Sequence, residues 1–313
     1  GGVFHPTQRV RRSLGVGGTC QSNRGRLRFA ARTCWRSHSV RGPSRAAGVW
    51  KQVKTYALVN QKGGVGKTTT AVSLGSQLAQ VGRKVLIVDV DPQANATACL
   101  GIGPEQVSRG TYEALIDGVP AQDCVLHSPK LKLTLLPSTS ALAGAQIELG
   151  EVPEREFALR RALEPLADRF DHVLIDCPPS LGLLTLNGLI AAQDGVIIPV
   201  QCEYLALEGL SQLMRTLERI RHSLFPELRV RGLLLTMYDS RTRLSDEVAE
   251  ELRKHFGDLV FDTVIPRSVR LAEAPSYGLP IALYAPTSPG GEAYRAFAEE
   301  LLTTDRGLIP LPA

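Results

Sequence analysis

The chain has 313 residues and a formal net charge of +5, with 36 basic and 31 acidic side chains. This length suits one α/β domain with a short extension. No apolar run approaches the roughly 20 residues of a membrane-spanning helix, so we expect no membrane association. The six cysteines form no Cys-x-x-Cys pair, which argues against a zinc or iron–sulfur site and for a reducing compartment.

Residues 1–50 differ from the rest of the chain. They hold ten arginines, no lysine and no acid, which leaves 26 basic and 31 acidic side chains, or −5, for the remainder. Rich in Gly, Ser and Arg and without a helical or strand period, they are expected to be disordered. Three explanations are open: an arm for nucleic-acid phosphates, an organelle transit peptide, or a stretch upstream of the natural start. The Gly-Gly beginning without Met favours the last.

A glycine-rich loop, NQKGGVGKTTT at 60–70, lies between a predicted buried strand at 56–59 and a predicted helix at 71–79. Strand, glycine loop and helix together predict a phosphate-binding loop. The glycines let backbone N–H groups converge on phosphate oxygens, and the helix N-terminus adds positive charge there. Lys67 is placed to reach the β- and γ-phosphates, and the Thr68 hydroxyl to bind Mg²⁺.

The loop departs from the general pattern in one way. The first glycine of that pattern is absent, and Asn60 and Gln61 stand at that point beside a second lysine, Lys62. This departure resembles the deviant Walker A loop of the ParA/MinD family, in which the extra lysine reaches across a dimer interface to the partner's nucleotide. The alternative, an accidental glycine-rich turn, requires two lysines, three glycines and a flanking β–α unit to coincide.

Apolar strand candidates then alternate with helix candidates. Continuous Val, Ile and Leu runs between amphipathic segments predict a mostly parallel sheet with helices on both faces, an α/β fold of the P-loop NTPase type over residues 51–313. Ligands of such sheets bind at the carboxyl ends of the strands. The expected strands are 85–88, 133–136, 173–175, 196–199, 233–236 and 260–261, and the expected helices are near 153–169, 182–192, 205–224, 244–256 and 289–302.

Two of these strands are followed by acidic residues. Asp91 comes just after the strand at 85–88, and Asp176 ends the strand at 173–175. A carboxylate close to a phosphate loop can orient water or hold metal, so Asp176 is read as a Walker B residue. The alternative for each is a helix cap or a turn former.

Six segments together resemble the chromosomal ParA (Soj) ATPases, in order and across roughly 54–303. They are the phosphate loop, VDVDPQAN (88–95), IDCPPSLG (175–182), PVQCEYLALEGL (199–210), LLTMYDSRTRL (234–244) and VIPRSVRLAEAPSYGLPI (264–281). The resemblance places catalytic roles on Lys62, Lys67 and Asp91, and Mg²⁺ binding on Thr68 and Asp176. The implied nucleotide contacts are Lys62, Gly63, Gly64, Val65, Gly66, Lys67, Thr68, Thr69, Pro266 and Ser268.

The resemblance also marks two regions near the end of the chain. Pro266 and Ser268 match an adenine-side turn that usually reads Pro-Arg-Asn, so the serine puts one base contact in doubt. Arg241 and Arg270 match the arginines that contact DNA. Because the chain beyond residue 50 is net acidic, a DNA surface must be local, and a solvated charged face is the alternative. A further basic stripe is predicted on one helix, at Arg215, Arg219 and His222.

What the family implies is an ATP- and Mg²⁺-dependent homodimer that binds DNA without sequence preference, in the cytoplasm on the nucleoid. A ParB (Spo0J-like) partner stimulates its hydrolysis of ATP to ADP and phosphate. A lysine across the interface can neutralise charge between the β- and γ-phosphates, so hydrolysis should be slow and require dimerisation.

Other classes of protein share this phosphate loop and are alternative interpretations of the sequence. A MinD-like cell-division regulator would end in an amphipathic membrane helix, which two prolines at 310–312 oppose. A ParA-like ATPase that positions another cargo would use the same dimer switch. An iron–sulfur carrier would need cysteine spacings that this chain lacks.

Overall fold

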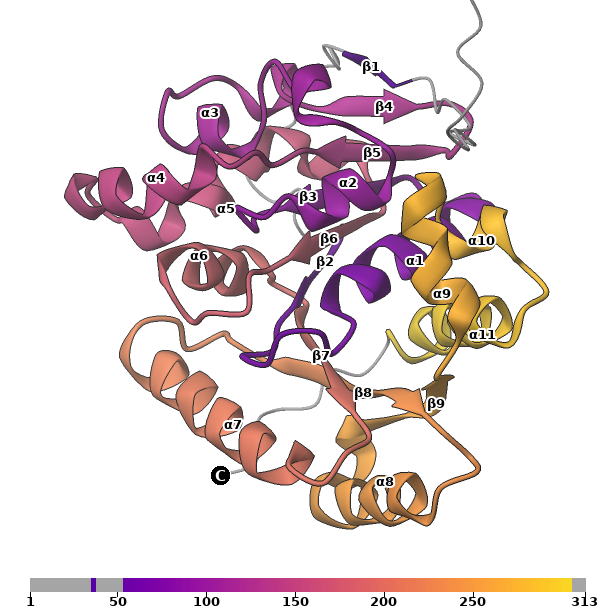
Figure 1. Cartoon of the computed structure of the whole chain (residues 1–313). Helices are drawn as coiled ribbons and strands as arrows, with labels where there is room; N and C mark the ends of the chain where they lie inside the picture. The colour runs from indigo at the N-terminus through magenta and orange to yellow at the C-terminus, as the bar shows by residue number, and fades with distance from the viewer. Residues whose placement is uncertain (1–34, 38–52, 306–313) are drawn as a thin grey trace, which may run out of the picture.

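A computed structural model describes residues 35–37 and 53–305 of the chain. Its centre is a nine-stranded sheet in the order β1-β4-β5-β3-β6-β2-β7-β8-β9 (Figure 1). Every pair from β5 to β9 along this order is parallel, and only β1–β4 and β4–β5 are antiparallel. The strands are β1 Arg36–Ser37, β2 Lys54–Leu58, β3 Val85–Asp89, β4 Leu126–Ser128, β5 Leu133–Leu136, β6 His172–Asp176, β7 Gly195–Gln201, β8 Val230–Tyr238 and β9 Val260–Pro266. The mostly parallel sheet is as predicted.

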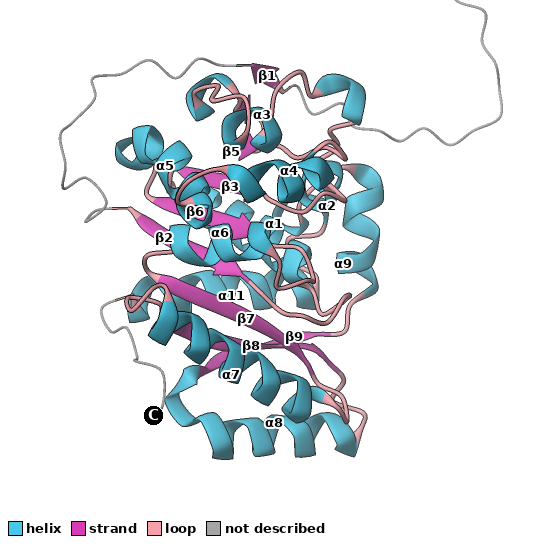
Figure 2. Cartoon of the chain, turned by 90° about the vertical axis from the view of Figure 1, so that its left-hand side faces the viewer, coloured by secondary structure: helices cyan, strands magenta, loops and turns pink. Residues whose placement is uncertain are grey.

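Helices cover both faces of the sheet (Figures 1 and 2). One face is packed by α1, α2, α10 and α11, and the other by α3 to α8. The α-helices are α1 Lys67–Gln80, α2 Asn95–Cys99, α3 Thr111–Leu115, α4 Leu142–Glu148, α5 Ala158–Leu163, α6 Leu183–Ala191, α7 Ala206–Ser223, α8 Arg243–Phe256, α9 Val269–Glu273, α10 Ile281–Tyr284 and α11 Pro289–Thr304. No helix in the described part of the chain is long and apolar enough to cross a bilayer.

Alternation along the strands builds the two cores. Val85 and Ile87 of β3 pack in the cluster that includes α1, while Leu86 and Val88 pack in the cluster that includes α6 and α7. All five residues of β3 are buried, as expected for a strand covered on both faces. The continuous apolar runs of the sequence therefore identify the central strands.

The expected helix at 153–169 is wrong as a single helix. The structure has a short α5 between two 3-10 segments, Arg155–Phe157 and Glu164–Arg169. Pro165 explains the second break, because proline lacks the N–H of an interior helical residue and its ring clashes with the preceding turn.

The edge of the sheet also contains strands that the sequence analysis did not predict. β4 has three residues, and β1 has two and falls within the stretch expected to lack structure. The Trp35 indole N–H donates a hydrogen bond to the Leu100 carbonyl at 3.2 Å beside β1. Strands this short show no period in the sequence. The rest of the prediction for residues 1–50 lies outside the described residues.

Candidate nucleotide site

The phosphate loop occupies the connection between β2, at the middle of the sheet, and α1. Gly64 and Gly66 have φ values of +76° and +93°, a left-handed conformation that side chains with a Cβ rarely adopt. Neighbouring strands anchor the loop: the Thr236 hydroxyl on β8 donates to the Val65 carbonyl at 2.9 Å. On the other side, Asn60 Nδ2 donates to the Pro199 carbonyl of β7 at 2.8 Å. The loop shape is thus fixed by the protein alone.

The loop forms an open cradle at the N-terminus of α1. A Cβ built on Gly63 or Gly64 would have nothing within 4 Å, so the backbone there is open to a ligand. No side chain caps the 14-residue helix, and its first turn holds no acidic residue. Its free N–H groups and positive end therefore remain available to an anion.

Lys67, the first residue of α1, is folded over this cradle. Only 7% of the residue is exposed, and its Nζ donates to the Lys62 carbonyl at 3.2 Å. Burial lowers the pKa of Lys67, while the nearby carboxylates of Asp176 and Asp91 oppose that shift. A partly desolvated ammonium of this kind interacts strongly with a phosphate.

Thr68 and Asp176 fit a Mg²⁺ site. Thr68 Oγ1 donates to Asp176 Oδ2 at 2.7 Å, and the fully buried Oδ1 has no hydrogen-bond partner among the described residues. An unpartnered buried carboxylate oxygen needs a donor or a cation. Within 35–37 and 53–305 no group of three or more His, Cys, Asp or Glu could enclose a metal. Mg²⁺ would therefore take its other ligands from phosphate and water, as it prefers.

A second buried carboxylate stands beside Asp176. β3 and β6 pair so that Asp89 lies opposite Asp176, and both side chains are fully buried. Burial and then the neighbouring Asp89 carboxylate raise the pKa of Asp176 well above its usual value. Burial likewise raises the pKa of Asp89. Two buried carboxylates cannot both ionise easily, so this corner of the sheet favours a divalent cation.

Asp91 lies in the loop that follows β3, with 6% of the residue exposed. Its Oδ1 accepts the Gln93 N–H at 2.9 Å, and its charge acts on both Lys67 and Asp176. The structure thus brings together Lys67, Thr68, Asp91 and Asp176, and the role of each in nucleotide binding and hydrolysis stays a prediction.

Lys62 behaves differently from Lys67. Its side chain is 49% exposed and forms an ion pair with Glu203, in the connection from β7 to α7. The next two residues, Tyr204 and Leu205, are 82% and 59% exposed, which is unusual for large apolar side chains. Sequence reasoning missed Glu203; its place just after a strand at the carboxyl edge is the signal that could have found it.

The structure shows where the predicted adenine-side turn lies but not which atoms contact the base. Pro266 ends β9, and Ser268 precedes α9 with an extended backbone. Three residues further on, Leu271 borders the same small pocket as Thr69 of α1. The segment therefore reaches the phosphate loop, and the base contacts of Pro266 and Ser268 stay a prediction.

Arg241 and Arg270 lie in the segments that follow β8 and β9, with side chains 83% and 59% exposed. Each is paired with an acid close to it in sequence. The Arg241 guanidinium makes two hydrogen bonds to Asp239, at 2.8 and 2.7 Å, and Arg270 makes one to Glu273 at 2.8 Å. Their role in DNA binding stays a prediction.

The predicted basic stripe lies on the surface of α7. Its three residues, Arg215, Arg219 and His222, are all exposed. His222 lies 3.0 Å from Glu218, so part of its charge would be balanced when it is protonated.

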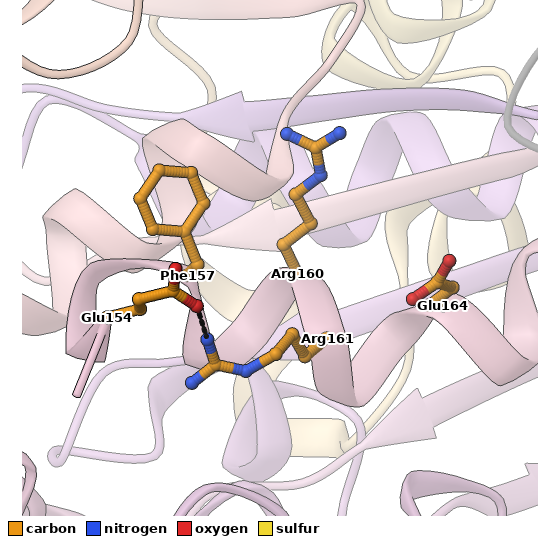
Figure 3. Close-up of a pocket in the computed structure, with 5 residues that line it drawn as sticks. All are labelled: Glu154, Phe157, Arg160, Arg161 and Glu164. Carbon is orange, nitrogen blue, oxygen red and sulfur yellow. Dashed lines mark hydrogen bonds and ion pairs between the residues drawn. The ribbon is translucent and has the colours of Figure 1, made fainter. Parts of the chain in front are cut away.

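A second pocket, beside α5, differs from the phosphate-loop site (Figure 3). Arg161 donates to Glu154 at 3.1 Å, so this arginine already has a carboxylate partner. None of the lining residues is buried, and none of them is a glycine. We assign it no part in nucleotide binding. Its lining residues are Glu154, Phe157, Arg160, Arg161 and Glu164.

A glycine loop between a parallel strand and an uncapped helix, with a buried lysine and a hydrogen-bonded Thr–Asp pair, defines a P-loop nucleotide-binding protein. A family model described as "AAA domain" matches residues 53–230. Sporulation initiation inhibitor protein Soj of Bacillus subtilis is 52% identical over 248 residues, covering 79% of this chain and 98% of that protein. Chromosome-partitioning ATPase Soj of Thermus thermophilus is 54% identical over 251 residues, covering 80% and 96%. The chain belongs to the Soj/ParA family of chromosome-partitioning proteins, which confirms the resemblance read from its motifs.

A solved structure extends this agreement to three dimensions. Cobyrinic acid a,c-diamide synthase from Mycobacterium smegmatis, with bound ADP and magnesium, has a TM-score of 0.71 and 40% identity, covering 83% of this chain and 99% of that one. The predicted α/β P-loop fold is confirmed by the sheet and by this likeness.

Proposed function

We propose that this chain is a chromosome-partitioning ATPase that binds ATP and Mg²⁺ at the phosphate loop and hydrolyses ATP to ADP and phosphate. The observation that carries this is the Thr68–Asp176 pair next to the phosphate loop, in which the buried Asp176 Oδ1 has no hydrogen-bond partner among the residues that the structure describes. The names of the relatives support it, since the Thermus thermophilus protein is a chromosome-partitioning ATPase. The Mycobacterium smegmatis structure holds ADP and magnesium.

Each residue of the site has a distinct part in hydrolysis. Loop N–H groups and Lys67 hold the β- and γ-phosphates, and Thr68 and Asp176 hold Mg²⁺. When bound, Mg²⁺ neutralises charge on the phosphate oxygens. The Asp91 carboxylate orients the attacking water in line with the γ-phosphate. Asp91 makes no contact that the ground-state cradle requires, so its contribution belongs to the transition state.

Lys62 completes the site from a second copy of the chain. The support is its exposure and its place beside the apolar Tyr204 and Leu205, which a dimer would cover. To reach the partner's nucleotide, Lys62 has to leave Glu203. Because hydrolysis then requires two copies, turnover is slow and depends on assembly.

DNA binding belongs to the ATP-bound dimer. Arg241 and Arg270 contact phosphates, and two copies double these charges on one face. Phosphate contacts carry no sequence information, so the protein would bind the nucleoid without sequence preference. A ParB-like, centromere-bound partner would stimulate hydrolysis and release it. An alternative is the same dimer switch applied to another cargo or to cell division.

The test is DNA binding with ATP, with ADP and without nucleotide, on the full chain and on residues 51–313. The shorter chain is suitable because the match to Soj already covers 98% of the Bacillus subtilis protein. We expect residues 51–313 to bind DNA tightly only with ATP; any nucleotide-independent binding seen only with the full chain would come from the ten arginines of residues 1–50. ATP turnover without any nucleotide-dependent DNA binding would contradict partitioning and favour a different use of the ATPase, such as the synthase reaction for which the Mycobacterium smegmatis structure is named.

A further inference from the structure

Two hydroxyl groups form a buried relay behind the hydrolytic loop. Thr97 of α2 and Ser138, just after β5, are 2% and 1% exposed. Thr97 donates both its hydroxyl and its N–H to Asp89 Oδ2, at 2.7 and 2.9 Å. The Thr97 oxygen in turn accepts the Ser138 N–H at 3.0 Å. The Ser138 hydroxyl then donates to the Asp91 carbonyl at 2.8 Å.

This relay holds both sides of the Asp91 backbone. The Asp91 N–H donates to Asp89 Oδ1 at 3.2 Å, and its carbonyl also accepts the Ala94 N–H at 2.8 Å. The Asp89 carbonyl is itself fixed by the Thr111 hydroxyl at 2.7 Å. The residue that should orient water is thus tied to three separate parts of the fold: the end of β3, α2 and the segment after β5.

A simple packing role would not require this chemistry. Apolar side chains of the same size would fill these positions without buried polar atoms that each need a partner. Here the Thr97 hydroxyl donates to Asp89, and the Ser138 hydroxyl makes its shorter contact, at 2.8 Å, with the Asp91 carbonyl and a longer one, at 3.4 Å, with the Thr139 carbonyl. A fully satisfied buried network fixes one local geometry, and an active-site group must be held to within about 0.5 Å to be effective.

We propose that Thr97 and Ser138 are positioning residues for hydrolysis, which set the Asp91 carboxylate by fixing its backbone through the Asp89 carboxylate. The proposal rests on the proposed role of Asp91. The relay is complete in the chain alone, so the loop is preorganised before nucleotide binds. Slow turnover then reflects the wait for the second copy and its Lys62, rather than the ordering of Asp91.

The expected signature is a loss of turnover without a loss of binding. Misplacing a catalytic group by about 1 Å costs up to about 100-fold in rate. Thr97→Val and Ser138→Ala should therefore lower kcat by about 10- to 100-fold, with the Kd for ATP changed by less than about threefold. Thr97→Ser keeps the hydroxyl and should retain turnover close to that of the unmodified chain.

The experiment measures kcat, the Kd for ATP and the thermal midpoint for these three variants and for Asp91→Ala. Thr55→Val is the matched control: Thr55 is fully buried at the far end of β2, and its hydroxyl has no partner within the described residues. It should leave kcat unchanged. If Thr97→Val does not fold, Ser138→Ala carries the test.

Three outcomes would overturn the proposal. First, Thr97→Val and Ser138→Ala could keep full turnover. Second, Thr97→Ser could lose as much turnover as Thr97→Val. Third, kcat could fall only in proportion to the ATP affinity or to the folded fraction. The Asp91→Ala variant distinguishes failure of the relay proposal from failure of the proposed role of Asp91. If Asp91→Ala retains turnover, the role of Asp91 is wrong; if it loses turnover while the relay variants do not, only the relay is wrong.

Discussion

The nucleotide site and the arginine loops lie on the same sheet but are built in opposite ways. Lys67 and Asp176 are buried; Lys67 binds the Lys62 carbonyl within its own loop, and Asp176 accepts a hydrogen bond from Thr68, which lies 108 residues away in the chain. Arg241 and Arg270 are exposed, and the carboxylates that they bind, Asp239 and Glu273, lie two and three residues away. The first region is fixed before any ligand arrives, while the second is free to exchange its partners. We infer that the nucleotide supplies the signal and that assembly of two copies turns it into a DNA-binding surface.

Asp91→Ala should have the largest effect on the fixed region. Removing the group that orients water should lower kcat by roughly 10² to 10⁴-fold. ATP affinity and ATP-dependent dimerisation should stay, because the ground-state contacts survive. Steady-state turnover and light scattering check this together. A rate near that of the unmodified chain would make Asp91 a structural turn residue.

Lys67→Ala acts on binding instead. No other charged side chain of the loop lies over the cradle, so ATP affinity should fall by about 100-fold, the value of a charged hydrogen bond of about 3 kcal/mol. Equilibrium binding of a fluorescent ATP analogue would measure this. Tight binding by the variant would mean that the phosphate loop is not the nucleotide site.

Lys62→Ala should separate binding from assembly. The exposed lysine is not needed for the monomer's own nucleotide, so ATP affinity should remain within about threefold. ATP-driven dimerisation should weaken by about 30-fold, as for loss of one partner of a buried interfacial charge pair. Analytical ultracentrifugation with ATP checks this, and unchanged dimerisation would remove the deviant-loop assignment.

Asp239→Asn should have the smallest effect and acts on the exposed region. The Asp239 carboxylate competes with DNA phosphate for the Arg241 guanidinium. Removing its negative charge leaves the guanidinium free to bind phosphate. Exposed ion pairs contribute little, so DNA affinity in ATP should rise only about two- to fivefold. Fluorescence anisotropy on residues 51–313 can measure this change. A fall in affinity would mean that Asp239 holds Arg241 in its binding position.

The phosphate loop, Asp176 and the central strands were predictable because their chemistry is local. Glycines, a lysine and a threonine must be consecutive to build the cradle, and a strand buried on both faces is continuously apolar. The Thr97–Ser138 relay was not predictable, since Ser138 lies 47 residues from the Asp91 carbonyl that it binds. Glu203 was also missed, although its place just after β7 at the carboxyl edge of the sheet is a local signal that could have found it. A helical pattern of apolar residues also does not reveal where a helix is interrupted, as Pro165 shows in the stretch expected to be one helix.

The most direct test of the account is the double variant Arg241→Glu with Arg270→Glu in residues 51–313. Using this range removes the ten arginines of residues 1–50, which could bind DNA in any nucleotide state. ATP-dependent dimerisation and DNA binding should be measured on the same sample across a salt series. The unmodified range should lose affinity with a log–log slope of about 0.9 per phosphate neutralised. We predict that the variant dimerises normally with ATP and no longer binds DNA. A variant that still binds DNA with ATP would contradict the account and direct attention to Arg215, Arg219 and His222 on α7.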